Sequence, residues 1–326
     1  MKKILIIVLS FLFFYTGMAQ KKDYVLVVHG GAGVLTGTYQ NPETREKYYA
    51  ALDSALNIGN AILSKGGKST EAVKAVVVYF ENNPLFNAGK GATYTNDGSF
   101  ELDAAIMDGK DLSAGAVAGV RTIKNPILAA WAVKNNSPHV LLTGHGAEIF
   151  AQEQQLDTVD NSYFATPKTL KWIEELKAQS KKHGTVGCVA LDMNGDLAAA
   201  TSTGGTPRKK WGRIGDSPLI GAGTYADNNS CAVSCTGHGE YYIRNVVAYD
   251  LCARVKYLNE PIEKAAGYII YQKLSNEAGS GGLIAVDKNG NIAMTFNSPG
   301  MFRGYVVKEA AKPEVIKRIG ICEEMK

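Results

Sequence analysis

A threonine enclosed by glycines has the surroundings most suited to chemistry in this sequence. Gly184-Thr185-Val186-Gly187 opens a run that predicts a β-hairpin with an Asn194-Gly195 turn. A threonine hydroxyl is a weak nucleophile unless a base lies next to it, and one such base is the threonine's own α-amine. That amine has a reference pKa of about 7.7–8.0, so a useful fraction is neutral near neutral pH. The segment is typical either of a hidden N-terminal nucleophile or of a structural threonine on an edge strand.

Freeing this amine requires cleavage of the Gly184–Thr185 bond. The Thr185 hydroxyl can attack the Gly184 carbonyl, which moves the acyl group from nitrogen to oxygen and leaves an ester for water to hydrolyse. Gly184 tolerates the strained backbone that this step needs. Gly184 and Thr185 are therefore the predicted self-cleavage site.

A second turn could stabilise the negative charge that such chemistry develops. Thr236-Gly237-His238-Gly239-Glu240 follows a predicted strand, Ser230 to Cys235, and precedes a predicted helix from about Tyr241 to Val255. A glycine-bracketed turn at a helix N-terminus offers backbone N–H groups and a hydroxyl to an oxyanion. The same pattern is also typical of a plain strand-to-helix turn.

Two opposite charges lie in the glycine-rich loop from Gly212 to Pro218. The guanidinium of Arg213 can bind a carboxylate and the carboxylate of Asp216 can bind an ammonium, which together match the head group of an amino acid. Such a pair is otherwise most often a solvated surface ion pair. The five histidines lack zinc-ligand spacing. Gly66-Gly67-Lys68-Ser69 lacks the first glycine of a phosphate-binding loop, because that position is Ile62.

The elements that must position these residues belong to a chain of 326 residues, which is long enough for one large domain or two ordinary ones. Residues 1–19 are predicted to be a signal peptide, with a charged start, an apolar run from Ile4 to Tyr15 and small residues before the cleavage point. The apolar run is too short for a membrane span. No lipid-anchor cysteine follows it, since the first cysteine is Cys188. We expect an exported, periplasmic protein.

Apolar periodicity predicts a layered arrangement of helices and sheets. We expect a strand from Asp23 to Val28 that ends in a glycine-rich turn, His29 to Gly33, followed by helices from about Thr44 to Leu63 and from near Thr70. Further strands are expected around 100–107, 114–120 and 140–143. A polar linker is expected at about 152–184, in which Thr166-Pro167 starts a helix that closes at Lys181-Lys182-His183. A second hairpin pattern at 283–293 indicates antiparallel sheet. These patterns fit a sandwich with sheets in the middle.

Charge and cysteine content exclude some classes of protein. The formal net charge is +4 and no basic stripe is interleaved with aromatic residues, so no nucleic-acid partner is expected. An odd count of five cysteines is not typical of a disulfide framework. Cys231 and Cys235 point the same way in a strand-like run, and buried free thiols are favoured there over a single disulfide.

A long ordered series of segments closely resembles the plant-type asparaginase and isoaspartyl peptidase family of N-terminal-nucleophile (Ntn) hydrolases, over most of the mature chain. The matching segments are His29-Gly30-Gly31-Ala32-Gly33, Asn83-Pro84-Leu85-Phe86-Asn87-Ala88-Gly89, Glu101-Leu102-Asp103-Ala104, Met107-Asp108-Gly109, Gly115-Ala116-Val117, Ser137-Pro138-His139-Val140, the Thr185 segment, Gly215-Asp216-Ser217-Pro218, Thr236-Gly237-His238-Gly239-Glu240 and Gly279-Ser280-Gly281-Gly282.

The resemblance implies an α/β fold, the four-layer αββα Ntn-hydrolase sandwich. It implies a single Ntn domain, made as one precursor that cleaves itself into an α-subunit, residues 20–184, and a β-subunit, residues 185–326. The two subunits stay together, and two such heterodimers form a dimer. The implied reaction is hydrolysis of the side-chain amide of L-asparagine or of β-aspartyl dipeptides, which releases L-aspartate through an acyl-enzyme on Thr185.

The resemblance also assigns roles to individual residues. Thr185 attacks the amide carbon, Thr203 tunes the nucleophile, Thr236 and the Gly237 N–H stabilise the oxyanion, Arg213 and Asp216 bind the substrate head group, the carbonyls of Gly237 and Gly239 assist, and Asn87 supports the nucleophile. No cofactor is implied for catalysis. A structural sodium ion is implied in a loop, on the main-chain carbonyls of Phe80, Glu81, Asn83, Phe86, Ala88 and Lys90.

Two rival functions remain open from the sequence. A glycosylasparaginase-type amidase is the first, although Gly184 stands where that branch has an aspartate, and His238-Gly239-Glu240 stands where it has acidic residues. Both differences favour the isoaspartyl peptidase branch. The second rival, from a different class, is an exported protein that binds amino acids through Arg213 and Asp216 and never cleaves itself.

Overall fold

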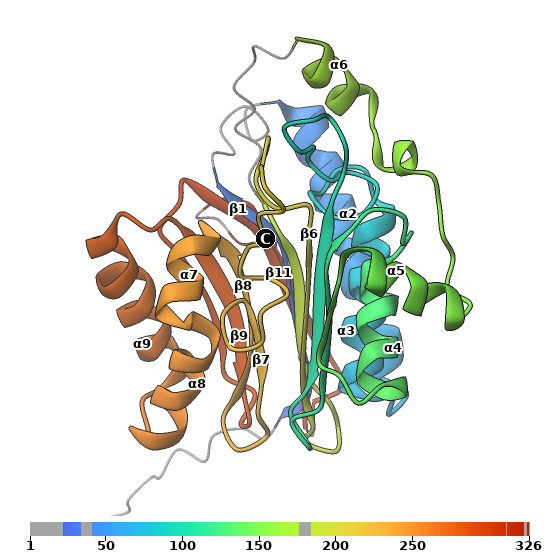
Figure 1. The fold of residues 1–326 in the computed structure, drawn as a ribbon. Coiled ribbons are helices and arrows are strands. Elements are labelled where there is room, and N and C mark those ends of the chain that lie inside the picture. The colour runs from blue at the N-terminus through green and yellow to red at the C-terminus, as the bar shows by residue number, and fades with distance from the viewer. Residues whose placement is uncertain (1–21, 34–40, 176–183, 311, 323–324, 326) are drawn as a thin grey trace, which may run out of the picture.

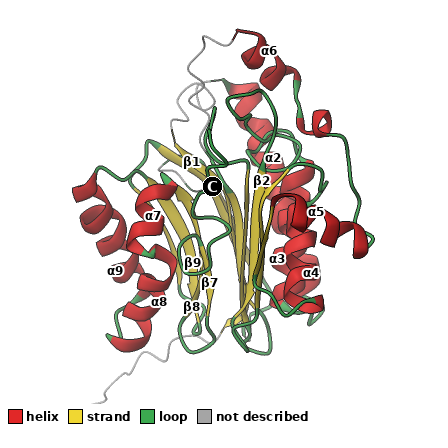
Figure 2. Cartoon of the chain, in the orientation of Figure 1, coloured by secondary structure: helices red, strands yellow, loops and turns green. Residues whose placement is uncertain are grey.

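Two β-sheets lie face to face between two layers of helices (Figures 1 and 2). The computed structural model describes residues 22–33, 41–175, 184–310, 312–322 and 325. The expected signal peptide and the expected helix end at 181–183 lie outside the described residues. Among those that are described, no helix is both long and apolar enough to cross a bilayer. The arrangement is the four-layer αββα sandwich that the resemblance implies, which confirms the predicted fold class.

The larger sheet contains eight strands in the order β12-β11-β1-β5-β6-β2-β3-β4. Their bounds are β1 (Lys22–Gly33), β2 (Leu102–Asp108), β3 (Ala114–Val120), β4 (Leu141–Thr143), β5 (Val186–Leu191), β6 (Leu197–Thr203), β11 (Gly300–Glu309) and β12 (Val315–Gly320). All neighbouring pairs are antiparallel except β3 and β4. Strands from before and after Thr185 are interleaved, because β1 lies between β11 and β5, and β2 pairs with β6.

The smaller sheet has the order β10-β9-β8-β7 and comes wholly from the second half of the chain. Its strands are β7 (Thr224–Ala226), β8 (Cys231–Gly237), β9 (Gly281–Asp287) and β10 (Ile292–Phe296). The two predicted hairpins are confirmed as β5–β6 and β9–β10, with turns at Asn194-Gly195 and Asn289-Gly290. Asp192 and Asp287 stabilise these turns by accepting backbone N–H groups through their Oδ1 atoms.

Helices cover the outer face of each sheet. On the larger sheet lie α2 (Pro42–Leu63), α3 (Ser69–Asn82), α4 (Pro126–Asn136) and α5 (Gly144–Glu153); on the smaller lie α7 (Gly239–Asn245), α8 (Val247–Tyr257) and α9 (Ile262–Gly267), which continues into a π-helical segment (Tyr268–Leu274). Separate apolar clusters fill the space under each helical layer and the space between the sheets. Asn41 caps α2 by accepting the Thr44 N–H, and Pro42 suits its first turn.

Two sequence predictions about local structure are wrong. The glycine-rich run His29 to Gly33 is not a turn but the second half of β1, because β11 supplies its backbone partners and a register shift at His29/Gly31 accommodates it. The helix expected from Tyr241 to Val255 is broken into α7 and α8 at Val246, whose backbone is left-handed at φ 47°.

The polar segment predicted as a linker contains ordered structure in its described part. A short 3₁₀ helix (Asn161–Phe164) and α6 (Pro167–Glu175) follow α5. The side chain of Asn161 holds this segment to the body of the protein by bonding both the N–H and the C=O of Phe100. The start of the segment is therefore fixed next to the residues that lead into β2.

Candidate active site

Thr185 lies one residue before β5, opposite the end of β6. Val186 pairs with Ser202 in the sheet, so the next residues outward, Thr185 and Thr203, face each other. The Thr185 hydroxyl donates a hydrogen bond to Thr203 Oγ1 over 3.1 Å, and both side chains are buried. Antiparallel register thus brings the predicted nucleophile and its predicted partner together.

The carbonyl oxygen of Gly184 is held by two donors. Asn87 Nδ2 donates to it over 2.7 Å and Thr203 Oγ1 over 3.2 Å. The Asn87 amide is fixed in turn, because its Oδ1 accepts the Thr93 N–H and its Nδ2 also donates to the Gly205 carbonyl. Paired donors on one carbonyl are the arrangement that stabilises an oxyanion when a nucleophile attacks that carbon.

Gly31 on β1 allows the main chain to approach this bond closely. A Cβ atom at position 31 would lie 2.8 Å from the Cα of Gly184 and 3.2 Å from the Thr185 nitrogen, and Gly31 has a φ of +108°. Both the contact and the dihedral angle restrict this position to glycine. The glycine-rich end of β1 therefore forms the wall behind the predicted cleavage site.

Thr236 and Gly237 come from the end of β8 in the smaller sheet. The Thr236 hydroxyl oxygen accepts the N–H of Ala32 over 3.2 Å, which leaves its own proton for donation. Gly237 lines a cavity that Thr185 and Thr203 also line. The predicted oxyanion turn thus shares a cavity with the predicted nucleophile through Gly237, although the Thr236 side chain does not line the cavity itself.

Arg213 enters the same cavity and is paired with Glu240. Its Nε and Nη2 donate to the two carboxylate oxygens of Glu240 over 2.9 and 3.0 Å. This pairing lowers the pKa of Glu240. The guanidinium is therefore oriented by the first turn of α7, and its remaining N–H groups can meet a carboxylate from the substrate.

Asp216 is buried beside Arg213 without a partner for one oxygen. Among the described residues, no donor reaches its Oδ2. Burial raises the pKa of Asp216 to about 6. A Cβ at position 239 would lie 2.9 Å from both Asp216 Oδ1 and Arg213 Nη2, so Gly239 keeps the space between the two charges clear. An unpartnered buried carboxylate is the group that an ammonium ion would satisfy.

The cavity between these residues is small in the intact chain. Its volume is about 10 Å³, about the room that a single water molecule needs. The residues that line it are Gly184, Thr185, Thr203, Gly205, Thr206, Arg213, Gly215, Asp216, Ser217 and Gly237. Because Gly184 is one of its walls, separation of Gly184 from Thr185 would enlarge the space next to the hydroxyl.

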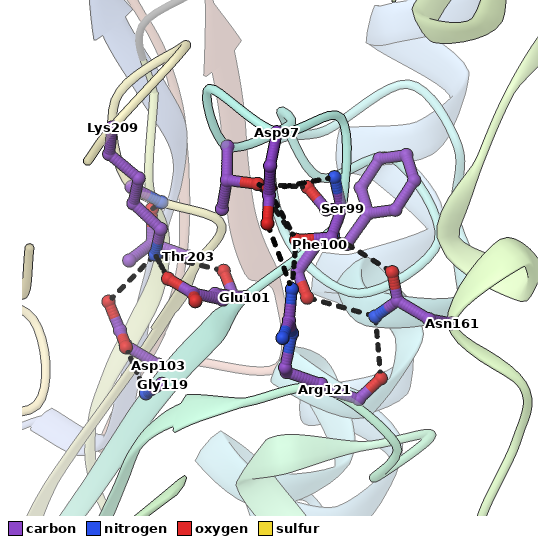
Figure 3. Close-up of polar contacts among 12 residues, drawn as sticks. Asp97, Ser99, Phe100, Glu101, Asp103, Gly119, Arg121, Asn161, Thr203 and Lys209 are labelled. Carbon is purple, nitrogen blue, oxygen red and sulfur yellow. Dashed lines mark hydrogen bonds and ion pairs between the residues drawn. The ribbon is translucent and has the colours of Figure 1, made fainter. Parts of the chain in front are cut away.

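The buried lysine Lys209 contacts the strand that pairs with the end of β6, and the sequence did not predict it as a site residue. Lys209 Nζ donates to the Glu101 carbonyl over 3.0 Å and lies 3.9 Å from the carboxylates of both Glu101 and Asp103 (Figure 3). Asp103 pairs with Thr203 across β2 and β6. Asp103 Oδ1 accepts the Gly119 N–H. This cluster fixes the strand ends that carry Thr203 and the loop that leads to Arg213.

A buried chain of hydroxyl groups links β1 to the loop that carries Asp216. His29 Nε2 lies 2.9 Å from Ser234 Oγ, which lies 2.7 Å from Thr201 Oγ1; Thr224 donates to Thr201 and to the Ser217 carbonyl. Burial lowers the pKa of His29 to about 3, so its ring is neutral. The only sequence signal for these linked hydroxyl groups was the presence of short polar residues inside apolar strands.

The loop from Phe80 to Lys90, where the resemblance implies a sodium ion, is closed by backbone hydrogen bonds. Lys90 N donates to the Glu81 carbonyl over 2.7 Å and Asn83 N to the Phe80 carbonyl over 3.1 Å. The Glu81 side chain points elsewhere, to Ser202, Asn125 and the Ile127 N–H. The described residues contain no group of three His, Cys, Asp or Glu side chains placed to hold a metal.

Comparisons with known proteins agree with this geometry. A family model described as asparaginase matches residues 22–316. The chain is 46% identical over 295 residues to an isoaspartyl peptidase of Salmonella typhimurium, which covers 86% of this chain and 94% of that protein. It is 44% identical over 297 residues to an isoaspartyl peptidase of Escherichia coli, covering 86% and 92%. It is 43% identical over 285 residues to an isoaspartyl peptidase/L-asparaginase of Mus musculus, covering 85% and 86%.

Proposed function

The chain belongs to the asparaginase family, and from that membership and the geometry around Thr185 we propose that it is a self-cleaving threonine hydrolase. It is an enzyme that hydrolyses asparagine and isoaspartyl peptides, as its relatives' names state for them. L-Aspartate is the common product. No cofactor takes part in the catalytic step. The observation that carries the proposal is the Gly184 carbonyl, gripped by Asn87 and Thr203 next to the Thr185 hydroxyl.

Maturation starts from the hydrogen-bonded pair of threonines. The Thr185 oxygen attacks the Gly184 carbon while its proton passes to Thr203, whose own proton is directed at the Gly184 oxygen. Asn87 donates to the same oxygen as negative charge develops there. As the tetrahedral adduct collapses, the Gly184 oxygen gives up its proton, the departing Thr185 nitrogen gains one, and the C–N bond breaks. An ester between Gly184 and Thr185 remains. Water then hydrolyses the ester, which frees the Thr185 amine and the Gly184 carboxylate.

The mature enzyme uses the freed amine as its general base. It takes the proton of the Thr185 hydroxyl, which attacks the side-chain amide carbon of the substrate. Thr236 and the Gly237 N–H stabilise the oxyanion, and the amine returns the proton to the departing ammonia or peptide. Water activated by the same amine hydrolyses the aspartyl ester and releases aspartate.

Recognition of the substrate depends on the two charged residues of the cavity. Arg213 binds the α-carboxylate, and Asp216 binds the α-ammonium with its unpartnered oxygen. The carbonyls of Gly237 and Gly239 assist with the ammonium. Because these groups contact only the aspartyl part, the same site accepts asparagine and β-aspartyl peptides.

The test is an intact-mass spectrum of the purified protein under denaturing conditions, with an assay on asparagine and a β-aspartyl dipeptide. We expect two chains, the shorter beginning at Thr185, and aspartate as the product from both substrates. Thr185→Ala should abolish cleavage and activity, and Thr185→Ser should retain part of each. An active, uncleaved Thr185→Ala protein would sink the mechanism.

A sodium ion in the Phe80–Lys90 loop is a further part of the proposal. Neutral carbonyl oxygens suit a hard cation, and the close approach of Lys90 N to the Glu81 carbonyl supports a loop folded tightly enough to converge several of them. Thermal unfolding in sodium chloride should occur at a higher temperature than in choline chloride of equal ionic strength. Equal midpoints would remove the ion from the proposal.

Export and assembly complete the proposal. Residues 1–19 act as a cleaved leader, so N-terminal sequencing of protein from the periplasm should begin at about residue 20; this is supported by the charged start and the apolar run. Two αβ heterodimers associate, and light scattering should give about twice the mass of one αβ heterodimer. Exposed apolar side chains at the β4 edge and on α5 (Val140, Leu141 and Ile149) offer a surface for that contact.

A further inference from the structure

Two cysteine side chains from different elements meet in the core of the smaller sheet's layer. Cys231 is the first residue of β8, and Cys252 lies in α8, which packs against β8. Their sulfur atoms are 2.7 Å apart, and Cys252 Sγ also lies 3.2 Å from the Cys231 carbonyl oxygen. Both residues are buried. The thiols therefore face each other at the junction of a strand and the helix that covers it.

This separation is between a bond and an ordinary contact. Non-bonded heavy atoms rest at about 3.5–4.0 Å, whereas a disulfide has a sulfur–sulfur distance of about 2.05 Å. The two sulfurs are thus closer than packing alone brings them, and a shift of less than an ångström separates them from bonding distance.

Cys235 does not compete with Cys252 for this partner. Cys235, for which the sequence left a disulfide with Cys231 open but favoured a free thiol, lies four residues along the same strand, about 13 Å away at the rise of a β-strand. Two cysteines whose Cα atoms are more than about 7 Å apart cannot be bridged without backbone movement. The side chains of Cys231 and Cys235 lie on the same face of the sheet, as expected. They are separated along the strand and do not point toward each other.

We propose that Cys231 and Cys252 form a disulfide in the exported protein. The two thiols lose two protons and two electrons to a disulfide-bearing oxidant, which becomes a dithiol: one thiolate attacks the oxidant's disulfide, and the second thiolate displaces the oxidant from the mixed disulfide. Because both sulfurs are buried in the folded protein, the exchange takes place before α8 docks on β8. The inference is independent of the catalytic mechanism.

The proposed bond would close a loop that contains part of the active site. The two cysteines are 21 residues apart, and the segment between them contains Thr236, Gly237 and Gly239, the turn that stabilises the oxyanion. A bond at its base would fix both ends of that segment to one point. The cross-link lies wholly after Thr185, so it cannot join the two subunits.

The first experiment counts free thiols in protein purified without reductant from an oxidising compartment. The protein is denatured, alkylated with N-ethylmaleimide and weighed intact. We expect three adducts on the five cysteines, five after prior reduction, and a cross-linked peptide that joins Cys231 and Cys252. Five adducts without reduction, or a bond between any other pair, would overturn the proposal.

Matched variants separate this pair from its neighbours. Cys235→Ser alters a buried cysteine of the same strand and should leave two adducts on four thiols, because the link remains. Cys252→Ser should leave all four remaining thiols reactive. Reductant should lower the midpoint of thermal unfolding by about 5–10 °C in the wild type and in Cys235→Ser, but not in Cys252→Ser. Equal sensitivity of all three proteins would contradict the assignment, and the wild-type adduct count stands even if a variant folds poorly.

Discussion

The side chains of Asn87 and Thr203 each donate one hydrogen bond to the Gly184 carbonyl, but their roles differ. Asn87 is locked by its own contacts to Thr93 and Gly205, so it is a fixed donor. Thr203 accepts from Thr185 and donates to Gly184, so it can also carry a proton. The two residues therefore hold the same carbonyl for different reasons, and only Thr203 connects it to the nucleophile.

We expect Thr203→Val to slow self-cleavage by about 10²- to 10³-fold, the usual effect of losing one oxyanion donor. Valine keeps the branched shape at the end of β6 but removes both the acceptor for Thr185 and the donor to Gly184. The rate is measured as the appearance of two bands on a denaturing gel. Thr203→Ser, which keeps the hydroxyl, is the control and should cleave within about tenfold of the wild type. A valine variant that matures at the normal rate would exclude Thr203 from the cleavage step.

The pH dependence of the mature enzyme should report two separate deprotonations. Burial raises the pKa of Asp216 to about 6, and the α-amine of Thr185 has a reference value of about 7.7–8.0. Both groups act in their deprotonated forms, so activity falls as pH falls through each value. A plot of log kcat/KM for asparagine should therefore have a slope of 1 between about pH 6 and pH 7.7 and a slope of 2 below about pH 6.

Asp216→Asn removes the lower of these two titrations. We expect the slope of 2 to disappear and kcat/KM at pH 8 to fall by about 10- to 100-fold, since a hydrogen bond to a charged group contributes ~1.5–3 kcal/mol. Glu240→Gln changes a carboxylate on the other side of Arg213 and should keep the steeper limb. A variant profile that still steepens below pH 6 would assign that titration to another group.

At the scale of elements, the break between α7 and α8 places a β-branched residue in an unfavourable backbone conformation. Val246 has φ 47° and ψ 50°, and its side chain is 45% exposed, so little packing depends on it. We expect Val246→Gly to raise the free energy of unfolding by about 1 kcal/mol, because glycine adopts this region without a Cβ clash. Chemical denaturation measures it. Val246→Ala keeps the Cβ clash and should change stability by less; equal gains would contradict this account.

Local patterns predicted the elements whose own residues determine them. Hairpin turns at Asn194-Gly195 and Asn289-Gly290, and the apolar stripes of α2 and α3, were all identified from short windows. The end of β1 was not, because His29 to Gly33 has little β-propensity and becomes a strand only through partners on β11, more than 260 residues away in sequence. The break at Val246 likewise has no local sequence signal, since valine rarely adopts a left-handed backbone conformation and so does not predict one.

The site follows the same division. Thr185, Thr203, Thr236, Arg213 and Asp216 could be named from glycine-rich motifs and a family resemblance. The fold brings all of them except Thr236 around one cavity, and Thr236 precedes Gly237, which lines it. Lys209 could not, and Asp103 lay in a matching segment without a predicted role, because a charged residue near a motif usually points to solvent and only the assembled sheet buries this pair. Burial, which depends on distant strands, is the part that spacing does not encode.

Over the whole molecule, the order of strands predicts that the two subunits remain together after cleavage. Strand β1 is hydrogen-bonded to β11 and β5, and β2 to β6, so each subunit supplies strands between those of the other. No cysteine precedes Thr185, so no disulfide can join the two pieces. The cleaved protein should elute as one peak in size exclusion, with or without reductant, and separate only in denaturant. Free α-subunit under native conditions would contradict this.

In the proposed maturation, the interleaved strands also change the kinetic order of folding at the moment of cleavage. The precursor refolds in a first-order process, whatever its concentration. After the cut, the same sheet can be rebuilt only when two separate polypeptides meet, so recovery from unfolding becomes second-order and fails on dilution. The proposed maturation therefore produces an active enzyme that no longer refolds readily. The height of its barrier to unfolding, more than its equilibrium stability, sets how long it stays active.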